Sequence, residues 1–434
     1  MSTYFEIAYA AASNRLCLFT GTGFSKAVSA DAAPSWQSLL EDISATLPDP
    51  VRIKSALFPI GSPNPLPLEE AAQIIEIELQ RQGRSIHEEI ARHISKIALA
   101  GDNKAITDFI NGNSFEVLTT NYDKLFQALA GDQSHQTITP GLPIPRSPAQ
   151  IQIYHVHGSI DSPTNMVVTS DDYFHFLNVD SYFSRKLSTI LHENTVVILG
   201  YSLGDTNLKS ILSDYKGFSR TNVIGGSIFL ISRNEIDQHI KDYYSHSFGI
   251  RVIDQIEIHT FFDAINRALP DARKCAEYSR SNIRKVLYEN HNYKDEYLLV
   301  ESSFFEIIAS ISAIGTSINA PDVVKLLGRI IEKKIGFTRI KGSWEQYAHL
   351  ASWLLYLGTI LEFRSLSIRD VYLSATLQSM NAMSKEKRLG YSWLAYRTWS
   401  NGWSNVIPSN RALIKEYIEA KSVWADAKKV VEGG

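Results

Sequence analysis

The chain of 434 residues carries 43 Lys and Arg against 46 Asp and Glu, which gives a formal net charge of -3 at pH 7. Its 44% hydrophobic and 21% charged residues are usual for a globular protein, and its length predicts two domains. This balance gives no global reason to expect nucleic acid or an anionic membrane as a partner. No apolar run approaches the roughly 20 residues that span a bilayer, and no basic stretch precedes an apolar one near Met1, so we expect a soluble, cytoplasmic protein.

Short apolar and β-branched segments alternate with segments of helical pattern over the first 270 residues. The predicted strands are 16–20, 115–119, 151–155, 166–169, 195–199, 226–231 and 249–253. The predicted helices are 36–47, two helices between 68 and 100 that break near Gly83, and 122–130. Residues 48–67 are predicted to form a loop and residues 137–148, with four prolines, an extended connection. This alternation predicts an α/β fold with a parallel sheet and helices on both faces.

The residue pattern changes near Pro270: before it, predicted strands alternate with helices, and after it, amphipathic helical segments predominate. We therefore predict an α/β domain over residues 1–271 and a mainly α-helical domain over residues 272–434, for assembly or regulation. The second part is rich in Trp and Tyr between Trp344 and Trp403, a pattern that fits core packing or a protein interface. The basic run Arg329–Lys334 is interpreted as a solvated helix face.

Two glycine-containing turns follow predicted strands directly. Gly21-Thr-Gly-Phe-Ser25 follows the first strand, and Gly200-Tyr-Ser-Leu-Gly-Asp205 follows the strand over 195–199. Glycines let a backbone approach a phosphate closely, and the amides of the next helix favour an anion. Either turn alone also fits an ordinary connection between a strand and a helix. Two such turns in one parallel sheet favour a dinucleotide.

Polar residues end the strand over 115–119, where the sequence reads Thr119-Thr-Asn-Tyr-Asp123. Ligands of open α/β sheets bind at the carboxyl ends of strands, so Asn121 and Asp123 are candidate site residues. The alternative is a turn that caps the following helix, because Asn and Asp favour helix starts.

Two histidines flank Val156 after the strand over 151–155. His155 and His157 would point to the same face of a strand, as a metal pair does, but they lack thiolate or carboxylate companions. Each also fits a buried structural histidine. Because Gly158 follows His157 and allows a substrate to approach, His157 is the better candidate for a general base at neutral pH.

These segments together resemble the sirtuins. The motifs occur in the order and approximate spacing of that family over residues 1–270: Gly-Thr-Gly-Phe-Ser at 21–25, Thr-Thr-Asn-Tyr-Asp at 119–123, His-Gly-Ser at 157–159 and Gly-Tyr-Ser at 200–202. The resemblance implies a Rossmann-like domain of the sirtuin type, with a helical insertion, that binds NAD and cleaves its bond between nicotinamide and ribose. It implies that Asn121 and Asp123 lie beside the nicotinamide ribose and that His157 is the catalytic histidine.

The same resemblance implies the remaining NAD contacts. Gly21, Thr22, Gly23 and Ser25 are similar to the pyrophosphate-binding loop, and Thr120 and Gly158 belong to the motifs at the ribose. Gly200 and Ser202 are similar to the lining on the adenosine side, and the segment from Ser232 to Asn234 is placed near the adenine ribose.

Two departures separate the chain from the protein deacetylases of that family. Only Cys17 and Cys275 occur, so the zinc module of two Cys-x-x-Cys pairs is missing, and neither a disulfide framework nor a zinc site of four cysteines can form. The Pro-Asp-Phe-Arg stretch after the glycine loop is also missing. Both departures are typical of sirtuin-like NADases of bacterial anti-phage defence. Some of those relatives pair with a HerA-type ATPase, which makes such an ATPase a candidate partner beside a homo-oligomer.

We therefore predict an NAD glycohydrolase effector of anti-phage defence, with NAD as its substrate and no zinc. Asn121 would bind a ribose hydroxyl or orient water, and His157 would accept a proton. Asp123 would orient neighbouring groups or stabilise the cationic ribose. The alternatives are a module that senses NAD or ADP-ribose without turnover, a zinc-free deacylase or ADP-ribosyltransferase, and a scaffold with no NAD chemistry.

Overall fold

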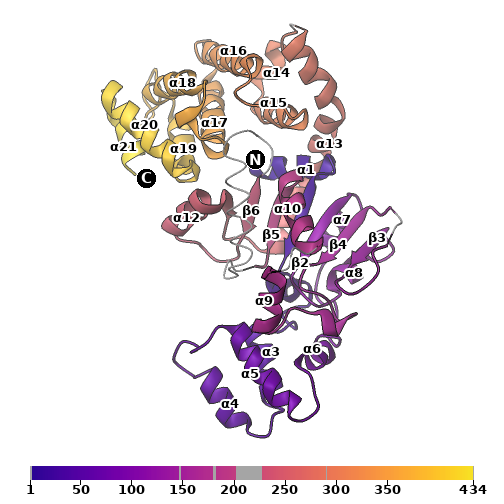
Figure 1. The fold of residues 1–434 in the computed structure, drawn as a ribbon. Helices are drawn as coiled ribbons and strands as arrows, with labels where there is room; N and C mark the ends of the chain where they lie inside the picture. The colour runs from indigo at the N-terminus through magenta and orange to yellow at the C-terminus, as the bar shows by residue number, and fades with distance from the viewer. Residues whose placement is uncertain (1, 146–147, 179–181, 202–226, 290, 434) are drawn as a thin grey trace.

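A parallel sheet lies at the centre of the molecule, between a helical insertion and a C-terminal helical region (Figure 1). The computed structural model describes residues 2–145, 148–178, 182–201, 227–289 and 291–433. The strands are β1 (Leu16–Thr20), β2 (Phe115–Thr119), β3 (His135–Ile138), β4 (Ile151–His155), β5 (Thr195–Leu199), β6 (Ile228–Ile231) and β7 (Ile250–Ile253). Their order is β3-β4-β2-β1-β5-β6-β7, and every neighbouring pair is parallel. The predicted α/β fold with a parallel, Rossmann-like sheet is confirmed.

The strand order reverses between β1 and β5. The chain runs from β1 outward to β2 on one side, and after β4 it crosses over to β5 on the other side of β1. At such a point the two connections leave β1 and β5 in opposite directions, which opens a crevice at their carboxyl ends. The fold therefore places the Gly21 turn and the Gly200 turn on either side of the crevice.

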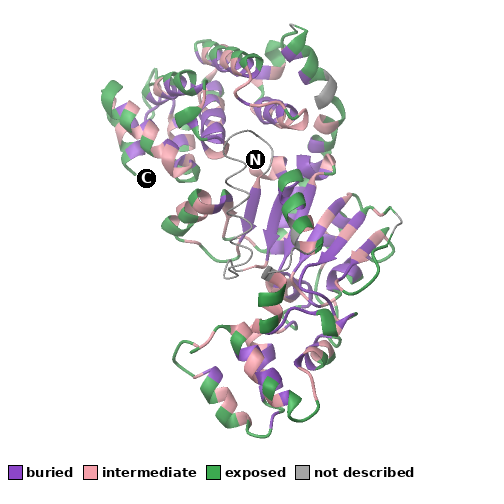
Figure 2. Cartoon of the chain, in the orientation of Figure 1, coloured by how far each residue is buried: buried purple, intermediate pink, exposed green. Residues whose placement is uncertain are grey.

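Helices cover both faces of the sheet. The described helices that accompany it are α1 (Ser2–Ala12), α2 (Thr22–Val28), α7 (Lys104–Ile110), α8 (Leu125–Ala130), α9 (Ser170–Asn178), α10 (Tyr182–Glu193), α12 (Gln238–Phe248) and the long α13 (Ile258–Tyr288). Leu18 and Val197 face a core formed with α1, α7, α8 and α13, whereas Phe19 and Ile198 face a second core with α10 and α12. Since β1 and β5 are buried along their whole length (Figure 2), they read in the sequence as continuous apolar runs.

The helical insertion between α2 and β2 contains α3 (Trp36–Ser44), α4 (Pro50–Leu57), α5 (Leu68–Gln80) and α6 (Ile86–Ile94). The break predicted near Gly83 is confirmed, since this glycine lies between α5 and α6 with a φ of +68°. The loop predicted over residues 48–67 is wrong in its first half. Asp49 caps α4 by accepting a hydrogen bond from the Arg52 amide, and Pro50 occupies the first helical position.

The C-terminal region is mainly helical in its described part, with one isolated β-bridge between Met383 and Ser392. Its helices are α14 (Asp295–Leu299), α15 (Ser302–Ala313), α16 (Pro321–Thr338), α17 (Trp344–Ile360), α18 (Arg369–Asn381), α19 (Trp393–Gly402), α20 (Pro408–Lys421) and α21 (Ala425–Glu432). The proposed boundary at residue 272 falls inside α13, which is continuous through Pro270. Its first half belongs to the core under the sheet through Phe261 and Phe262, and that core continues into the C-terminal helices.

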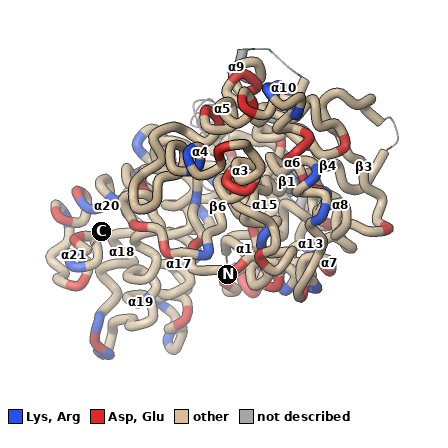
Figure 3. The backbone as a smooth tube through the Cα atoms, turned by 90° about the horizontal axis from the view of Figure 1, so that it is seen from below, with Lys and Arg blue, Asp and Glu red and all other residues tan. Residues whose placement is uncertain are grey.

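Buried aromatic side chains form much of the C-terminal core, as the packing interpretation expected. Trp353 and Trp399 are fully buried and Trp403 nearly so, whereas Trp344 is half-exposed. Lys334 contradicts the solvated interpretation of the basic run, because it is fully buried and its Nζ donates to the carbonyl of Leu298 over 2.9 Å. Positions of both charge signs are scattered along the backbone (Figure 3). Among the described helices, none is long and apolar enough to cross a bilayer.

Candidate functional site

Four loops that carry predicted site residues leave the same edge of the sheet. Strand register pairs Thr20 with both Thr119 and Leu199, and Thr119 with His155. The four strands therefore end at the same level, and the segments beginning at Gly21, Thr120, Val156 and Gly200 continue side by side. Two backbone bonds tie the loops further, from the Thr120 amide to the Thr20 carbonyl over 3.3 Å and from the Val156 amide to the Thr119 carbonyl over 2.9 Å.

Asn121, Ser25 and Asp123 form one chain of hydrogen bonds across the ends of β1 and β2. The Asn121 Nδ2 donates to the Gly21 carbonyl and to Ser25 Oγ, each over 2.8 Å. The Ser25 Oγ then donates to Asp123 Oδ2 over 2.6 Å. Since a serine hydroxyl has one hydrogen, its donation to the carboxylate fixes it as acceptor from the amide. Three residues predicted from separate motifs are thus joined directly.

This chain of hydrogen bonds fixes the orientation of the Asn121 side chain. Both Nδ2 hydrogens are used within the protein, and the Asn121 backbone amide donates to Thr119 Oγ1 over 3.1 Å. Within the described part of the chain, Oδ1 accepts no hydrogen bond. The amide oxygen is therefore the group that Asn121 offers to a hydroxyl or a water molecule.

Asp123 combines the two roles that the sequence left open. Its Oδ1 accepts a hydrogen bond from the Leu125 amide over 3.0 Å, which is the local turn that starts α8. Its Oδ2 accepts the Ser25 hydroxyl. The predicted start of this helix at Tyr122 is three residues early, because the turn occupies the residues before Leu125.

His155 is buried and holds the backbone of Asn121 in place. The ring is 1% exposed, its Nδ1 donates to the Asn121 carbonyl over 3.0 Å, and its Nε2 accepts from Gln127 Nε2 over 2.7 Å. Burial lowers the pKa of His155, which keeps the ring neutral with its hydrogen on Nδ1. Because both nitrogens contact protein groups, His155 is a structural histidine and no partner of His157 in a metal pair. In the described ranges, no group of three or more His, Cys, Asp and Glu side chains could hold a metal ion.

His157 lies at the end of β4, beside the end of β2. Its side chain is 5% exposed, and helix α9 covers it. The rings of Tyr173 and Phe176 contact the imidazole edge to face, with centroids 5.4 and 5.5 Å away. These two aromatic residues were not predicted as part of the site. The pattern that could have identified them is their spacing of three residues on a helix that follows the His-Gly motif.

The glycines of the site are needed first for packing between loops. A Cβ on Gly200, whose φ is +62°, would lie 2.0 Å from the Phe24 amide nitrogen. The Gly23 amide donates to the Gly200 carbonyl over 2.7 Å, so this amide does not point toward a ligand. Gly158 has a φ of +84°, and a Cβ there would lie 2.8 Å from the Met166 Cα. The space that we expected a substrate to use at Gly158 holds the backbone of the chain itself.

Some predicted residues in the described part of the chain form no hydrogen bond with Asn121, Ser25 or Asp123. Thr22 begins α2 and is partly exposed beside Gly21. The Ser232 Oγ donates to the Asn234 carbonyl over 2.8 Å at the end of β6, two strands from β1, and Asn234 is exposed. Ser202 lies outside the described residues.

Known proteins resemble this chain over part of its length. Residues 116–253 match the family described as SIR2-like domain, a range from β2 to β7 that includes Asn121 and His157 but not the Gly21 loop. The NAD(+) hydrolase ThsA of Enterococcus faecium is 35% identical over 111 residues, which are 24% of this chain and 23% of that protein.

Two further relatives extend the comparison. The defense-associated sirtuin 2 of Bacillus subtilis is 24% identical over 147 residues, 33% of this chain and 14% of that protein. The NAD(+) hydrolase ThsA of Bacillus cereus is 25% identical over 286 residues, 65% of this chain and 52% of that protein. The chain thus spans between 14% and 52% of the length of these relatives. The chain is thus similar to SIR2-like proteins over residues 116–253, with the parallel strand β2 at the start of that range and β4, β5, β6 and β7 within it.

Proposed function

We propose that this chain is an NAD glycohydrolase that acts in anti-phage defence. Relatives named NAD(+) hydrolase and defense-associated sirtuin support the proposal. The observation that supports this most is the hydrogen-bonded chain Asn121–Ser25–Asp123 at the sheet edge where His157 also lies. An oriented neutral amide and an imidazole at the carboxyl ends of adjacent parallel strands suit a ribose better than a purely structural turn.

The reaction breaks the bond between ribose C1′ and the nicotinamide nitrogen. Nicotinamide leaves with the bonding electron pair as a neutral molecule, so no acid is needed, and positive charge develops on the ribose. The oxygen of a water molecule then bonds to C1′, and His157 accepts the proton that this water loses, a step worth about 10²–10⁴-fold in rate. The products are ADP-ribose, nicotinamide and one proton.

Each protein group has a defined task in this proposal. Asn121 Oδ1 accepts a hydrogen bond from a ribose hydroxyl or from the attacking water, while Ser25 and Asp123 hold the amide still. Preorganisation of this kind avoids reorientation during the reaction. Thr22, Thr120, Gly200 and the segment from Ser232 to Asn234 remain proposed contacts of the rest of NAD, as does Ser202.

An assay of purified protein with NAD and chromatographic identification of products tests the proposal. We expect nicotinamide and ADP-ribose in equal amounts, and no turnover by His157→Ala with an unchanged circular dichroism spectrum. The His135→Ala variant, a histidine on edge strand β3, is the matched control and should remain active. Normal turnover by His157→Ala would rule out its proposed role.

The same assay separates the alternatives. Binding of NAD in calorimetry without consumption, alone and with a HerA-type ATPase, would indicate a sensing module. Nicotinamide release that requires an acylated peptide or an acceptor protein would indicate a deacylase or an ADP-ribosyltransferase. Light scattering on the same samples tests the proposed homo-oligomer and the proposed ATPase partner.

A further inference from the structure

The segment from Met166 to Phe176 wraps around His157. The Val167 amide donates to the His157 carbonyl over 2.9 Å, and the Tyr122 hydroxyl donates to the Val167 carbonyl over 2.6 Å. The same segment continues into α9, which begins at Ser170 and whose Tyr173 and Phe176 contact the His157 ring. Both the backbone and the ring of His157 are thus positioned by one stretch of chain.

One carboxylate oxygen holds this stretch in shape. Asp172 Oδ2 accepts hydrogen bonds from the Val168 amide over 3.1 Å, from the Thr169 amide over 2.8 Å and from Thr169 Oγ1 over 2.8 Å. The strand predicted over residues 166–169 is wrong for this reason, since two of its amides bond to a side chain instead of a neighbouring strand. Asp172 therefore fixes the turn at which the segment enters α9.

The same oxygen connects α9 to the helical insertion. His87 Nε2 lies 3.0 Å from Asp172 Oδ2, the oxygen that also accepts the amides of Val168 and Thr169. His87 thus contacts the residue that closes the turn between the His157 backbone and α9. The contact is partly sheltered, with 15% of the His87 side chain and 30% of the Asp172 side chain exposed.

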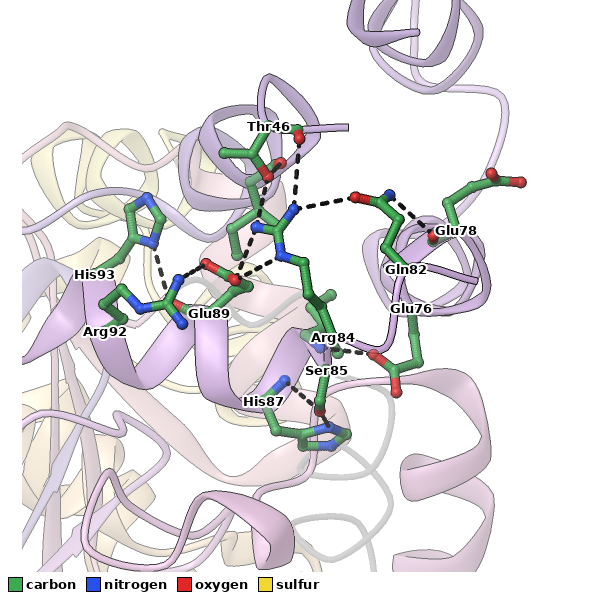
Figure 4. A network of polar contacts seen from close by, with 12 residues as sticks. Thr46, Glu76, Glu78, Gln82, Arg84, Ser85, His87, Glu89, Arg92 and His93 are labelled. Atoms are coloured by element: carbon green, nitrogen blue, oxygen red, sulfur yellow. Dashed lines mark hydrogen bonds and ion pairs between the residues drawn. The ribbon is translucent and has the colours of Figure 1, made fainter. Parts of the chain in front are cut away.

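His87 is held on a rigid helix start, which Figure 4 shows. Ser85 Oγ accepts the His87 amide over 3.3 Å and lies 3.3 Å from its Nδ1, and Glu76 Oε2 accepts the Ile86 amide over 2.6 Å. One turn along α6, Glu89 forms ion pairs with two arginines, Arg84 and Arg92, over 2.7 and 2.6 Å (Figure 4). These bonds leave the His87 ring little freedom.

The charges around the pair favour its ionic form. Burial opposes a charged imidazole and by itself would lower the pKa of His87. This effect is outweighed by the hydrogen bond and charge of Asp172, the charge of Glu76 and the backbone of Met166, so the pKa of His87 is raised. Burial also opposes the Asp172 carboxylate, yet the hydrogen bonds from His87, Thr169 and Val168 lower the pKa of Asp172 to about 2. Of the elements packed on α6, α9 and α5 supply the charges that face His87.

We propose that Asp172 and His87 are positioning residues for the candidate active site: their contact fixes α9 so that Tyr173 and Phe176 hold the His157 imidazole in its working orientation. This inference rests on the proposed function for its kinetic consequence, but the positioning of His157 is measurable without it. The helical insertion thereby acts on the site through α9.

The test combines histidine NMR with kinetics on the full chain. Ring currents of Tyr173 and Phe176 shift the Cε1–H signal of His157, which is assigned among the 12 histidines by comparison with His157→Gln. In Asp172→Asn we expect this signal to move toward that of a free histidine. The kcat for NAD should fall about ten- to a hundredfold with a much smaller change in KM, because misplacement of a reacting group costs that much.

The chain offers a matched control and a second variant. Asp171→Asn removes the same charge one residue away. The Asp171 side chain is exposed and is not one of the groups that hold the turn, so the His157 signal and kcat should stay unchanged. His87→Ala removes the other partner of the pair and keeps the Asp172 turn. His87→Gln should bring the His157 signal and kcat part of the way back to the wild-type values, because its amide can still donate to Asp172.

The outcomes are distinct. A His157 signal and kcat at wild-type values in both Asp172→Asn and His87→Ala would overturn the inference. If the His157 signal moves as expected but the wild-type chain consumes no NAD, the proposed function fails and the positioning stands.

Discussion

Ser25 Oγ and Asp123 Oδ2, 98 positions apart in sequence, lie 2.6 Å apart at the edge where β1 and β2 end. The bond links the helix after the glycine loop to the turn after β2. Since Asn121 donates to the same hydroxyl, the serine sets the direction of the amide that we place beside the ribose. Ser25 is therefore a more important member of the site than its place in a phosphate-type loop suggests.

Ser25→Ala should uncouple Asn121 from Asp123. We expect kcat for NAD to fall about tenfold or more, because the amide loses one of the two acceptors that orient it. Ser29→Ala is the matched control, since Ser29 is a buried serine at the end of the same helix that accepts the Ala33 amide over 3.0 Å. Each variant loses about 1 kcal/mol of stability, so urea unfolding should not separate them, whereas turnover should.

Gly200→Ala should be far more destabilising than Gly249→Ala. Both glycines have positive φ, +62° and +68°, so each substitution costs about 1–2 kcal/mol of backbone strain. Only at Gly200 does the added Cβ also meet the backbone of Gly23 and Phe24, which raises the expected loss to about 3 kcal/mol or more. Equal unfolding midpoints for the two variants would contradict the close contact between the β1 and β5 loops.

The buried neutral His155 should make the protein less stable as the pH falls. Burial lowers the pKa of His155 in the folded state, so the unfolded chain binds the proton first, below about 6.5. This stability is present above that pH and is lost as the pH falls through the folded value. Urea unfolding at pH 7.5 and 5.5 should show a smaller loss in His155→Gln than in wild type. His239→Gln, an exposed histidine on α12, should behave as wild type.

Lys334 should affect stability at the other end of the pH range. Burial lowers its pKa to about 7, against an opposing contribution from the charge of Glu301. The unfolded chain therefore binds one more proton than the folded chain between about pH 7 and the ordinary lysine value near 10.4, and stability rises with pH across that interval. Unfolding of wild type and Lys334→Met at pH 7 and 9.5 should show this rise in wild type only. An equal rise in both proteins would contradict the assignment to Lys334.

The sheet was predictable from sequence because its central strands are buried on both faces. β1, β2 and β5 are mostly apolar five-residue segments, and the structure has each of them at the predicted bounds. The edge strand β3 was not predicted, because three of its four residues are polar and so short a segment carries little signal. Helix α4 carried its start signal in Asp49 and Pro50, but the Pro, Gly and Ser that follow obscured it.

The site could be predicted only to the level of strand ends. Parallel strands end at one edge, so Asn121, Ser25 and Asp123 could be expected near one another. The sequence could not predict that His155 would bond to the Asn121 carbonyl or that Asp172 would take the amides of Val168 and Thr169. Such bonds depend on which buried polar groups lack partners in the folded chain, and no periodicity records this.

The most direct test of the central claim is the rate of nicotinamide release from NAD by Asn121→Ala, measured beside wild type and Asn113→Ala. Asn113 is the matched control, because it lies just before the opposite end of β2 and its Nδ2 donates to the Phe109 carbonyl. We predict that wild type and Asn113→Ala release nicotinamide and that Asn121→Ala, folded and equally assembled, does not. Nicotinamide release by Asn121→Ala at the wild-type rate would contradict the account.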